Sequence, residues 1–363
     1  MLNQELKNRN LPKLKGREEM VEILQREVYG RFPNPSEYSV TASTPVTVEK
    51  RYCCGAVEHS YVDLTITLPN GSHTFRVDRL LHTDGKRRPM VLLNNIHRMN
   101  ESQYFAKEEL SEYDVDYLVY CFKDITSDDG DFSTGLAPLL LPEGRESDTA
   151  PGKISMWAWG SMRVLDYALT LPGTDAENIA VAGHSRLGKT ALVTGMMDER
   201  IKFVFSNAAG CAGDSIAHGS TGLVAQGGYG TAGRGENIED ICKKFPYWFC
   251  KNYQKYTEAK LSDDFDQHYL IASLAPRFVM VGSCTLDDWA DQKSQQLCAL
   301  AGGKMWENMG LPGLVGSDHY LEAGESLDEG RVGFFMIKSH HFLSRHSWRH
   351  FLNFVEKHRY DKV

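Results

Sequence analysis

A serine in a tight turn is the first residue of the sequence whose surroundings could support chemistry. Ser185 follows the apolar run Ile179–Ala182 and precedes a stretch with helical spacing that begins at about Arg186. A strand, a turn and a helix in this order place a serine hydroxyl above a sheet and at the amino end of a helix, where it can attack a carbonyl carbon. The segment therefore predicts a serine hydrolase.

Such a serine needs a carboxylate and a histidine, which in this class of enzyme follow it in that order along the chain. Three aspartates come after the apolar run at 278–281: Asp287, Asp288 and Asp291. Two histidines come after the apolar run at 332–337: His340 and His341. His319 lies between these groups but has no apolar strand directly before it, so it ranks below His340 and His341 as a candidate base. On spacing alone the choice of acid and of base stays open within each group.

The same turn also fits a phosphate-binding loop. The segment Gly183–Thr190 matches the pattern G-x-x-x-x-G-K-[ST], whose backbone amides cradle phosphates. A nucleoside triphosphatase of that kind also needs an acidic residue at the end of a neighbouring strand to hold magnesium. The next apolar run ends instead in Ser206 and Asn207. The hydrolase interpretation is therefore favoured over the nucleotide-binding one.

The elements that must position these residues follow a pattern typical of a three-layer α/β sandwich. Apolar and polar residues alternate over 62–68, and Pro69-Asn70-Gly71 turns the chain into a second strand, which predicts an antiparallel hairpin near the N-terminus. Helical spacing predicts helices at 18–29, at 154–169 and from 186. Short, continuous apolar runs predict buried parallel strands at 89–93, 117–122, 179–182, 203–205, 278–281 and 332–337. Repeated β-α units of this kind predict a mostly parallel central sheet.

Composition excludes several classes of protein. Forty Lys and Arg against 48 Asp and Glu give a net charge of −8, and no basic block exceeds Lys86-Arg87-Arg88, so a nucleic-acid partner is not expected. No run approaches the 18 apolar residues that span a bilayer, and the N-terminal stretch has no apolar core of a signal peptide. We therefore expect a cytoplasmic protein without a membrane partner. The eight cysteines form no C-x-x-C pair and have no zinc spacing, so we expect reduced thiols, no metal and no cofactor.

The nucleophile segment resembles that of a known family. Gly183-His184-Ser185-Arg186-Leu187-Gly188-Lys189 is similar to the Gly-x-Ser-Arg-x-Gly-Lys motif of the glucuronoyl esterases, which are carbohydrate esterases with the α/β-hydrolase fold. This motif accounts for Leu187, which stands where the second glycine of G-x-S-x-G is usual. Other stretches resemble bacterial members: EILQREVYGRFP at 22–33, MDERI at 197–201, SNAAGCAG at 206–213, GENIEDICKKFPYWF at 235–249 and DDWAD at 287–291.

The resemblance implies a role for each matching residue. Ser185 would attack the ester carbonyl, and the side chain of Arg186 would help to form the oxyanion hole. The base would be His341, with His340 as the weaker alternative. Three further residues would contact the uronic acid: Lys189, Glu236 and Trp289.

The acid departs from the fungal pattern. The fungal glutamate lies in a stretch similar to SNAAG, where this chain has Ala208. Bacterial relatives place an acid after the later strand, where Asp287 aligns, and Asp288 and Asp291 stay open. Taken singly, Asp287 and Asp291 also fit caps of a helix that begins near Trp289.

These observations predict one α/β-hydrolase domain over 1–363, because the strands before residue 125 and after residue 275 must share a sheet to bring serine, acid and base together. Residues 208–268, rich in glycine and aromatic residues, are expected to form an insertion over the active site.

The predicted function is that of a serine esterase acting on a small or oligosaccharide (4-O-methyl)glucuronoyl or related uronic acid ester. The alternatives are an acetyl-sugar deacetylase, a P-loop nucleoside triphosphatase and a sugar-binding protein that has lost its activity. The sequence gives no oligomeric state.

Overall fold

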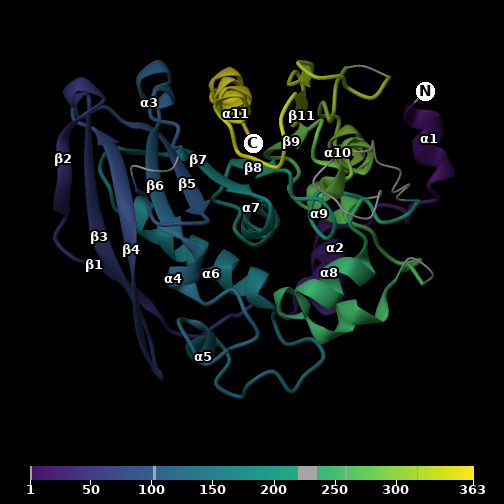
Figure 1. Cartoon of the computed structure of the whole chain (residues 1–363), viewed down its shortest axis with the longest axis horizontal. Coiled ribbons are helices and arrows are strands. Elements are labelled where there is room, and N and C mark those ends of the chain that lie inside the picture. Colours follow the sequence, from purple (N-terminus) through teal and green to yellow (C-terminus); the bar gives the residue numbers. More distant parts are fainter. Residues whose placement is uncertain (1, 101–103, 220–234, 258–259, 317) are drawn as a thin grey trace.

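The computed structural model describes residues 2–100, 104–219, 235–257, 260–316 and 318–363. Within them, eleven strands form one sheet in the order β1-β3-β4-β6-β5-β7-β8-β9-β11-β10, with β2 also paired to β3 (Figure 1). The strands are β1 Ser39–Ala42, β2 Val46–Tyr52, β3 Val57–Leu68, β4 Gly71–His82, β5 Arg88–Asn95, β6 Asp116–Cys121, β7 Thr174–His184, β8 Phe203–Asn207, β9 Phe278–Cys284, β10 Ser326–Leu327 and β11 Val332–Ile337. The α-helices are α1 Leu2–Asn8, α2 Arg17–Leu24, α3 Glu109–Glu112, α4 Phe122–Ile125, α5 Ala137–Leu140, α6 Lys153–Ala168, α7 Arg186–Met197, α8 Ile238–Lys244, α9 His268–Ala272, α10 Gln292–Asn308 and α11 Arg345–His358.

The centre of the sheet is parallel, as its continuous apolar strands predict. Strands β6, β5, β7, β8, β9 and β11 pair in parallel, whereas β1 to β4 form the antiparallel N-terminal part that contains the predicted hairpin. Parallel strands end at the same edge of a sheet, so the loops after β7, β9 and β11 meet there. This edge therefore receives the serine, acid and histidine segments.

Helices cover both faces of the sheet and complete a three-layer α/β arrangement. One apolar core joins a sheet face to α6, α7 and α9, and a second joins the opposite face to α3 and α11. Figure 1 shows α11 and α3 on one side of the strands and α6 and α7 on the other. The predicted fold class is confirmed.

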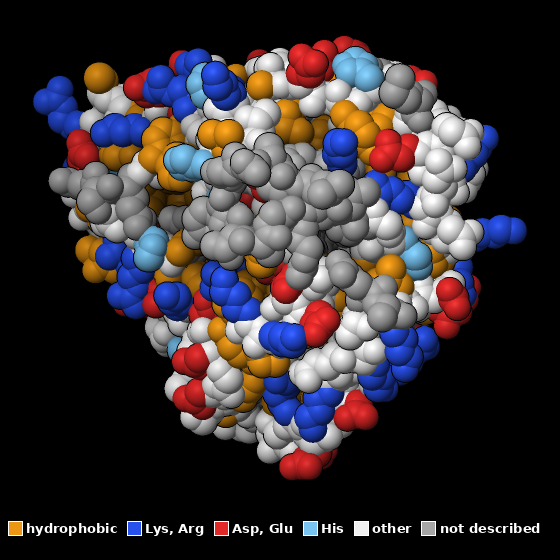
Figure 2. Space-filling model, turned by 45° about the vertical axis from the view of Figure 1, so that its right-hand side comes forward, with side chains coloured by type: hydrophobic (Ala, Val, Ile, Leu, Met, Phe, Trp, Pro, Cys, Tyr) orange, Lys and Arg blue, Asp and Glu red, His pale blue; other side chains and the backbone are white. Residues whose placement is uncertain are grey.

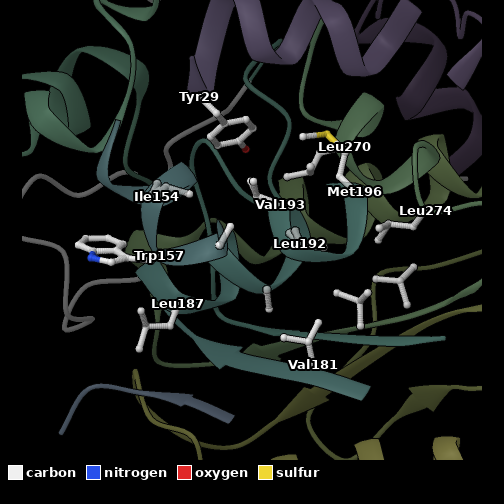
Figure 3. Close-up of a cluster of buried hydrophobic side chains, with 14 of the residues drawn as sticks. Tyr29, Ile154, Trp157, Val181, Leu187, Leu192, Val193, Met196, Leu270 and Leu274 are labelled. Carbon is white, nitrogen blue, oxygen red and sulfur yellow. The ribbon is translucent and has the colours of Figure 1, made fainter. Parts of the chain in front are cut away.

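Helix α7, which follows the serine, is fixed by close packing. Its residues Leu187, Leu192 and Val193 are fully buried, and Figure 3 shows them in one apolar cluster with Trp157 of α6 and Val181 of β7. Protein interiors are as densely packed as organic crystals, so a helix held in this way resists small displacements. The position of the turn before α7 is fixed with it.

The structure adds elements that the sequence patterns did not predict. Strand β2 is exposed at every residue except Tyr52, so it lacks the alternating apolar pattern by which a half-buried strand is recognised. The helix expected to begin near Trp289 is α10, which begins at Gln292 and continues through Gly302 and Gly303, although glycine lowers helical propensity. The predicted helix at 18–29 is α2 continued by a π-helical turn, Gln25–Tyr29.

The predicted insertion at 208–268 lies between β8 and β9. Its described part contains α8 and short 3₁₀ turns at Pro246–Trp248 and Lys251–Lys255. The glycine-rich stretch at 220–234 lies outside the described residues.

Candidate active site

Ser185 occupies a strained turn between β7 and α7. Its backbone has φ 59° and ψ −126°, a conformation that residues with a side chain rarely adopt. The turn is closed by a bond from the Gly188 amide to the Ser185 carbonyl at 2.9 Å. A Cβ on Gly183 would lie 2.0 Å from the Leu187 carbonyl oxygen, so only glycine fits there. This geometry is that of a nucleophile elbow, which exposes the serine oxygen above the sheet.

His341 and Asp287 form a hydrogen-bonded pair at the same edge of the sheet. His341 Nδ1 lies 2.6 Å from Asp287 Oδ2, and the aspartate side chain is fully buried. A buried carboxylate on Nδ1 holds the imidazole in the tautomer whose Nε2 can accept a proton. His341 lines the same cavity as Ser185, so the pair is placed to serve that serine.

The other candidate acids have different partners. Asp288 accepts a long hydrogen bond of 3.5 Å from Gln292, and burial raises the pKa of its carboxyl. Asp291 is the N-cap of α10 and accepts bonds from the amide and hydroxyl of Ser294 at 3.1 and 2.8 Å. The capping role considered for Asp291 is therefore what the structure shows, and Asp287 is the acid that the geometry favours.

The other candidate bases are exposed. His340 is exposed beside His341 but is not among the residues that line the cavity. His319 is exposed and lies 3.2 Å from Glu325. The geometry thus favours His341 as the base.

Lys189 and Glu236 are buried, although isolated charges of these types are usually solvated. Lys189 is 3% exposed and donates its Nζ hydrogen to the carbonyl of Ala209. Burial lowers the pKa of Lys189 and raises that of Glu236, and the attraction between the two charges opposes both shifts. Trp289 donates a side-chain hydrogen bond to Glu236, whose amide bonds back to the Trp289 carbonyl at 2.9 Å. The three residues form one connected group.

Arg186 follows Ser185 in the chain, and its guanidinium rests on an aromatic surface. As the first residue of α7, it has an amide N–H that has no acceptor within the helix. Its guanidinium carbon lies 4.7 Å from the centre of the Trp248 ring and 5.2 Å from that of Phe245. Arg186 lines the same cavity as Ser185, so its amide and guanidinium are the donors that could serve as an oxyanion hole there.

A cavity of about 720 Å³ joins these groups. Six of the seven predicted site residues line it: Ser185, Arg186, Lys189, Glu236, Trp289 and His341. The seventh, Asp287, is buried and bonded to His341. Ala208, at the position of the fungal glutamate, also lines the cavity and offers only a methyl group.

Two residues of the site were missed by sequence reasoning. Asp128 lines the cavity and forms an ion pair with Arg186 from a loop 58 residues earlier in the chain, so no local spacing connects the two. His184 places its ring centre 4.4 Å from that of His341. Burial, with a smaller contribution from His341, lowers the pKa of His184 to about 3. Its position next to Ser185 in the sequence could have identified His184 as a residue of the site.

The described part of the chain contains no group of three or more His, Cys, Asp or Glu side chains arranged to hold a metal ion. All eight cysteines are free thiols, and five of them are buried. Within the same residues, no helix combines the length and the apolar character needed to cross a membrane.

The fold and this arrangement of a strained serine, a histidine and a buried carboxylate are those of an α/β-hydrolase. Comparison with known proteins shows which esterases this chain resembles. A family model described as fungal glucuronyl esterase matches residues 144–310. The chain is 31% identical over 207 residues to carbohydrate esterase MZ0003 of an unknown prokaryotic organism, covering 57% of this chain and 44% of that protein. It is 31% identical over 175 residues to a 4-O-methyl-glucuronoyl methylesterase of Hypocrea jecorina, covering 48% and 35%.

Solved structures agree in fold. An esterase from a marine bacterial metagenome, described as a promiscuous CE15 esterase, matches with a TM-score of 0.79 at 23% identity, over 95% of this chain and 91% of that one. A glucuronoyl esterase from Solibacter usitatus matches with a TM-score of 0.79 at 24% identity, over 94% and 92%. The sequence matches to the two curated relatives span less than half of their length. The resemblance to glucuronoyl esterases and the α/β-hydrolase fold are confirmed.

Proposed function

We propose that this protein is a serine esterase that cleaves (4-O-methyl)glucuronoyl or related uronic acid esters through an acyl-enzyme. The observation that carries the proposal is that Ser185, on its strained turn, lines the same cavity as His341, which is bonded to buried Asp287. The relatives named as glucuronoyl esterases support the choice of substrate.

The reaction follows from the positions of these groups. Ser185 Oγ attacks the ester carbonyl and gives its proton to His341 Nε2, while Asp287 stabilises the resulting imidazolium. The developing oxyanion faces the Arg186 amide and its always-charged guanidinium. The C–O bond to the alcohol then breaks and His341 returns the proton to the leaving oxygen. A water molecule, deprotonated by His341, releases the uronic acid from Ser185 by the same steps.

The connected group of Lys189, Glu236 and Trp289 is suited to a sugar ring. A cavity of about 720 Å³ lies within the ~300–1,000 Å³ typical of small-molecule sites. Lys189 donates hydrogen bonds and Glu236 accepts them, and the Trp289 side chain supplies an apolar surface in the same wall. Hydroxyls on a uronic acid ring match this mixture of donor, acceptor and apolar surface.

The decisive experiment compares turnover of benzyl glucuronate with turnover of an acetylated sugar. We expect hydrolysis of the glucuronate ester to dominate and to be lost in Ser185→Ala, because that change removes the attacking oxygen. A clear preference for acetate would favour the deacetylase alternative. Unchanged hydrolysis in Ser185→Ala would overturn the serine mechanism.

The same preparation tests the remaining alternatives. Magnesium-dependent ATP binding that is lost in Lys189→Ala, without esterase activity, would favour the nucleotide-binding interpretation. Sugar binding without hydrolysis of either ester would favour the inactive sugar-binding protein. The cytoplasmic location and the lack of nucleic-acid and membrane partners stay predictions.

A further inference from the structure

The guanidinium of Arg186 is held by the largely buried carboxylate of Asp128. Arg186 Nη1 pairs with Asp128 Oδ2, while the other oxygen, Oδ1, accepts a 2.8 Å hydrogen bond from Trp248 Nε1. The Asp128 side chain is only 10% exposed. Both its oxygens are thus engaged, and its orientation is fixed by the same tryptophan on which the guanidinium rests.

The surface beneath the guanidinium is rigid. Trp248 and Phe245 stack with ring centres 3.8 Å apart and planes 1° apart. Tyr247 donates its hydroxyl hydrogen to the Asp128 carbonyl at 3.0 Å, which ties this aromatic segment to the Asp128 loop. A Cβ on Gly152 would lie 2.1 Å from the Trp248 carbonyl oxygen, so the segment also packs directly on the start of α6.

The loop that carries Asp128 is anchored from below by a buried lysine. Lys153 is fully buried, and its Nζ donates to Thr126 Oγ1 at 2.9 Å, to Ser127 Oγ at 3.1 Å and to the Asp131 carbonyl at 2.5 Å. All three donor hydrogens of the ammonium are used, two before and one after Asp128 in the chain. Moving this loop would leave a buried ammonium without its acceptors, which is costly. The Asp128 carboxylate therefore keeps a fixed place.

We propose that Asp128 is a positioning residue that sets the orientation of the Arg186 guanidinium in the oxyanion hole. A guanidinium has five N–H donors in one plane, so fixing Nη1 on Asp128 over the Trp248 ring also fixes where the remaining edge points. Ser185, Arg186 and Asp128 line one cavity. In the proposed arrangement the free edge of the guanidinium faces an ester carbonyl bound above Ser185. The proposal rests on the proposed esterase function and adds a residue that does not itself touch the substrate's reacting atoms.

The test is a double-mutant cycle of Asp128→Asn and Arg186→Ala, measured with benzyl glucuronate. Asparagine keeps the shape and the acceptor for Trp248 but loses the charge that holds the guanidinium. We expect Asp128→Asn to lower kcat by about 10-fold or more with little change in KM, since loss of an oxyanion donor itself costs about 10²–10³-fold in kcat. In the Arg186→Ala background the same change should alter kcat by less than about 2-fold, because Asp128 acts through Arg186 and that background lacks the guanidinium.

Two controls make the result specific. Asp129→Asn alters an exposed carboxylate next to Asp128 and should leave kcat unchanged. Asparagine retains an oxygen that can accept the hydrogen bond from Ser127 Oγ, which is 2.7 Å long in this structure. Counting active sites by the burst of benzyl alcohol corrects every rate for unfolded protein. Equal losses in both backgrounds, or no loss in Asp128→Asn, would overturn the positioning role while leaving the esterase function intact. A wild-type protein that releases no alcohol would instead refute the proposed function, and this proposal with it.

Discussion

The three aspartates after β9 show how differently neighbouring carboxylates are used. Asp287 accepts from His341 at 2.6 Å, Asp288 from Gln292 at 3.5 Å, and Asp291 caps α10. Their types are identical and they lie within five residues, so the sequence left all three as candidates. Only Asp287 is placed in the structure to hold the tautomer of His341, the proposed base.

Replacing these acids should separate their roles. Asp287→Asn should lower kcat by about 10⁴-fold, because asparagine favours the wrong tautomer of the histidine. Asp291→Asn should change kcat little, because asparagine is also a good N-cap and tolerates the left-handed backbone found there, with φ 55°. Steady-state rates on benzyl glucuronate measure both. Equal effects would mean that Asp287 is not the acid.

His184 should make the stability of the fold depend on pH. Its pKa is about 3 in the folded chain, against an ordinary value of 6.5, because the imidazole is buried and faces His341. The folded state therefore keeps His184 neutral where the unfolded chain protonates it. The stability that neutral His184 contributes to the folded state is fully present above pH 6.5 and is lost as the pH falls from 6.5 towards 3.

The measurement is the free energy of unfolding at pH values between 7 and 4. We expect His184→Gln to make its pH dependence shallower by up to about 1.4 kcal/mol per pH unit, the equivalent of one proton. His346→Gln, at an exposed histidine, is the matched control and should leave the slope unchanged. An identical slope in wild type and His184→Gln would contradict the assigned protonation state.

At the scale of elements, the strand–turn–helix unit at Ser185 contains a strained backbone conformation that the surrounding packing maintains. Leu187, Leu192 and Val193 fix α7 against the core, and β7 is held by parallel partners on both sides. The serine can therefore keep φ 59°, which an isolated turn would not favour.

Gly183→Ala tests this unit. A Cβ there would lie 2.0 Å from the Leu187 carbonyl oxygen, so the turn must open or the helix must move. We expect the free energy of unfolding to fall by about 2 kcal/mol or more and most of the activity to be lost. Gly173→Ala, just before β7, is the control, since its nearest contact would be an ordinary 3.7 Å. Chemical denaturation and the ester assay measure both effects, and a fully stable, active Gly183→Ala would refute the strained-turn explanation.

At the scale of the whole molecule, charge is distributed unevenly between surface and cavity. The chain carries a net charge of −8, and Figure 2 shows acidic and basic side chains mixed over one face. Among the described residues, the cavity wall has more basic than acidic side chains: Lys123, Arg186, Lys189 and Lys244 against Asp128 and Glu236. Such a local excess of positive charge in a cleft attracts developing negative charge, which suits the oxyanion and the uronate product of the proposed reaction.

The single sheet also explains why distant segments meet. Ser185, Asp287 and His341 follow β7, β9 and β11, which are parallel and lie in one sheet. The order of apolar runs predicted this arrangement, because buried parallel strands are continuously apolar. Exposed β2 has no such pattern and could be found only through its pairing with β3.

The sequence by itself determined the nucleophile motif, the order of serine, acid and histidine, and the parallel α/β fold. These depend on residue type and on spacing along the chain, which local physics converts into strands, turns and helices. Only the tertiary structure distinguished Asp287 from Asp288 and Asp291. It also showed that Lys189 is buried beside Glu236 and that Asp128 pairs with Arg186. Those outcomes depend on which side chains are brought together from distant segments, and on how far they are removed from water.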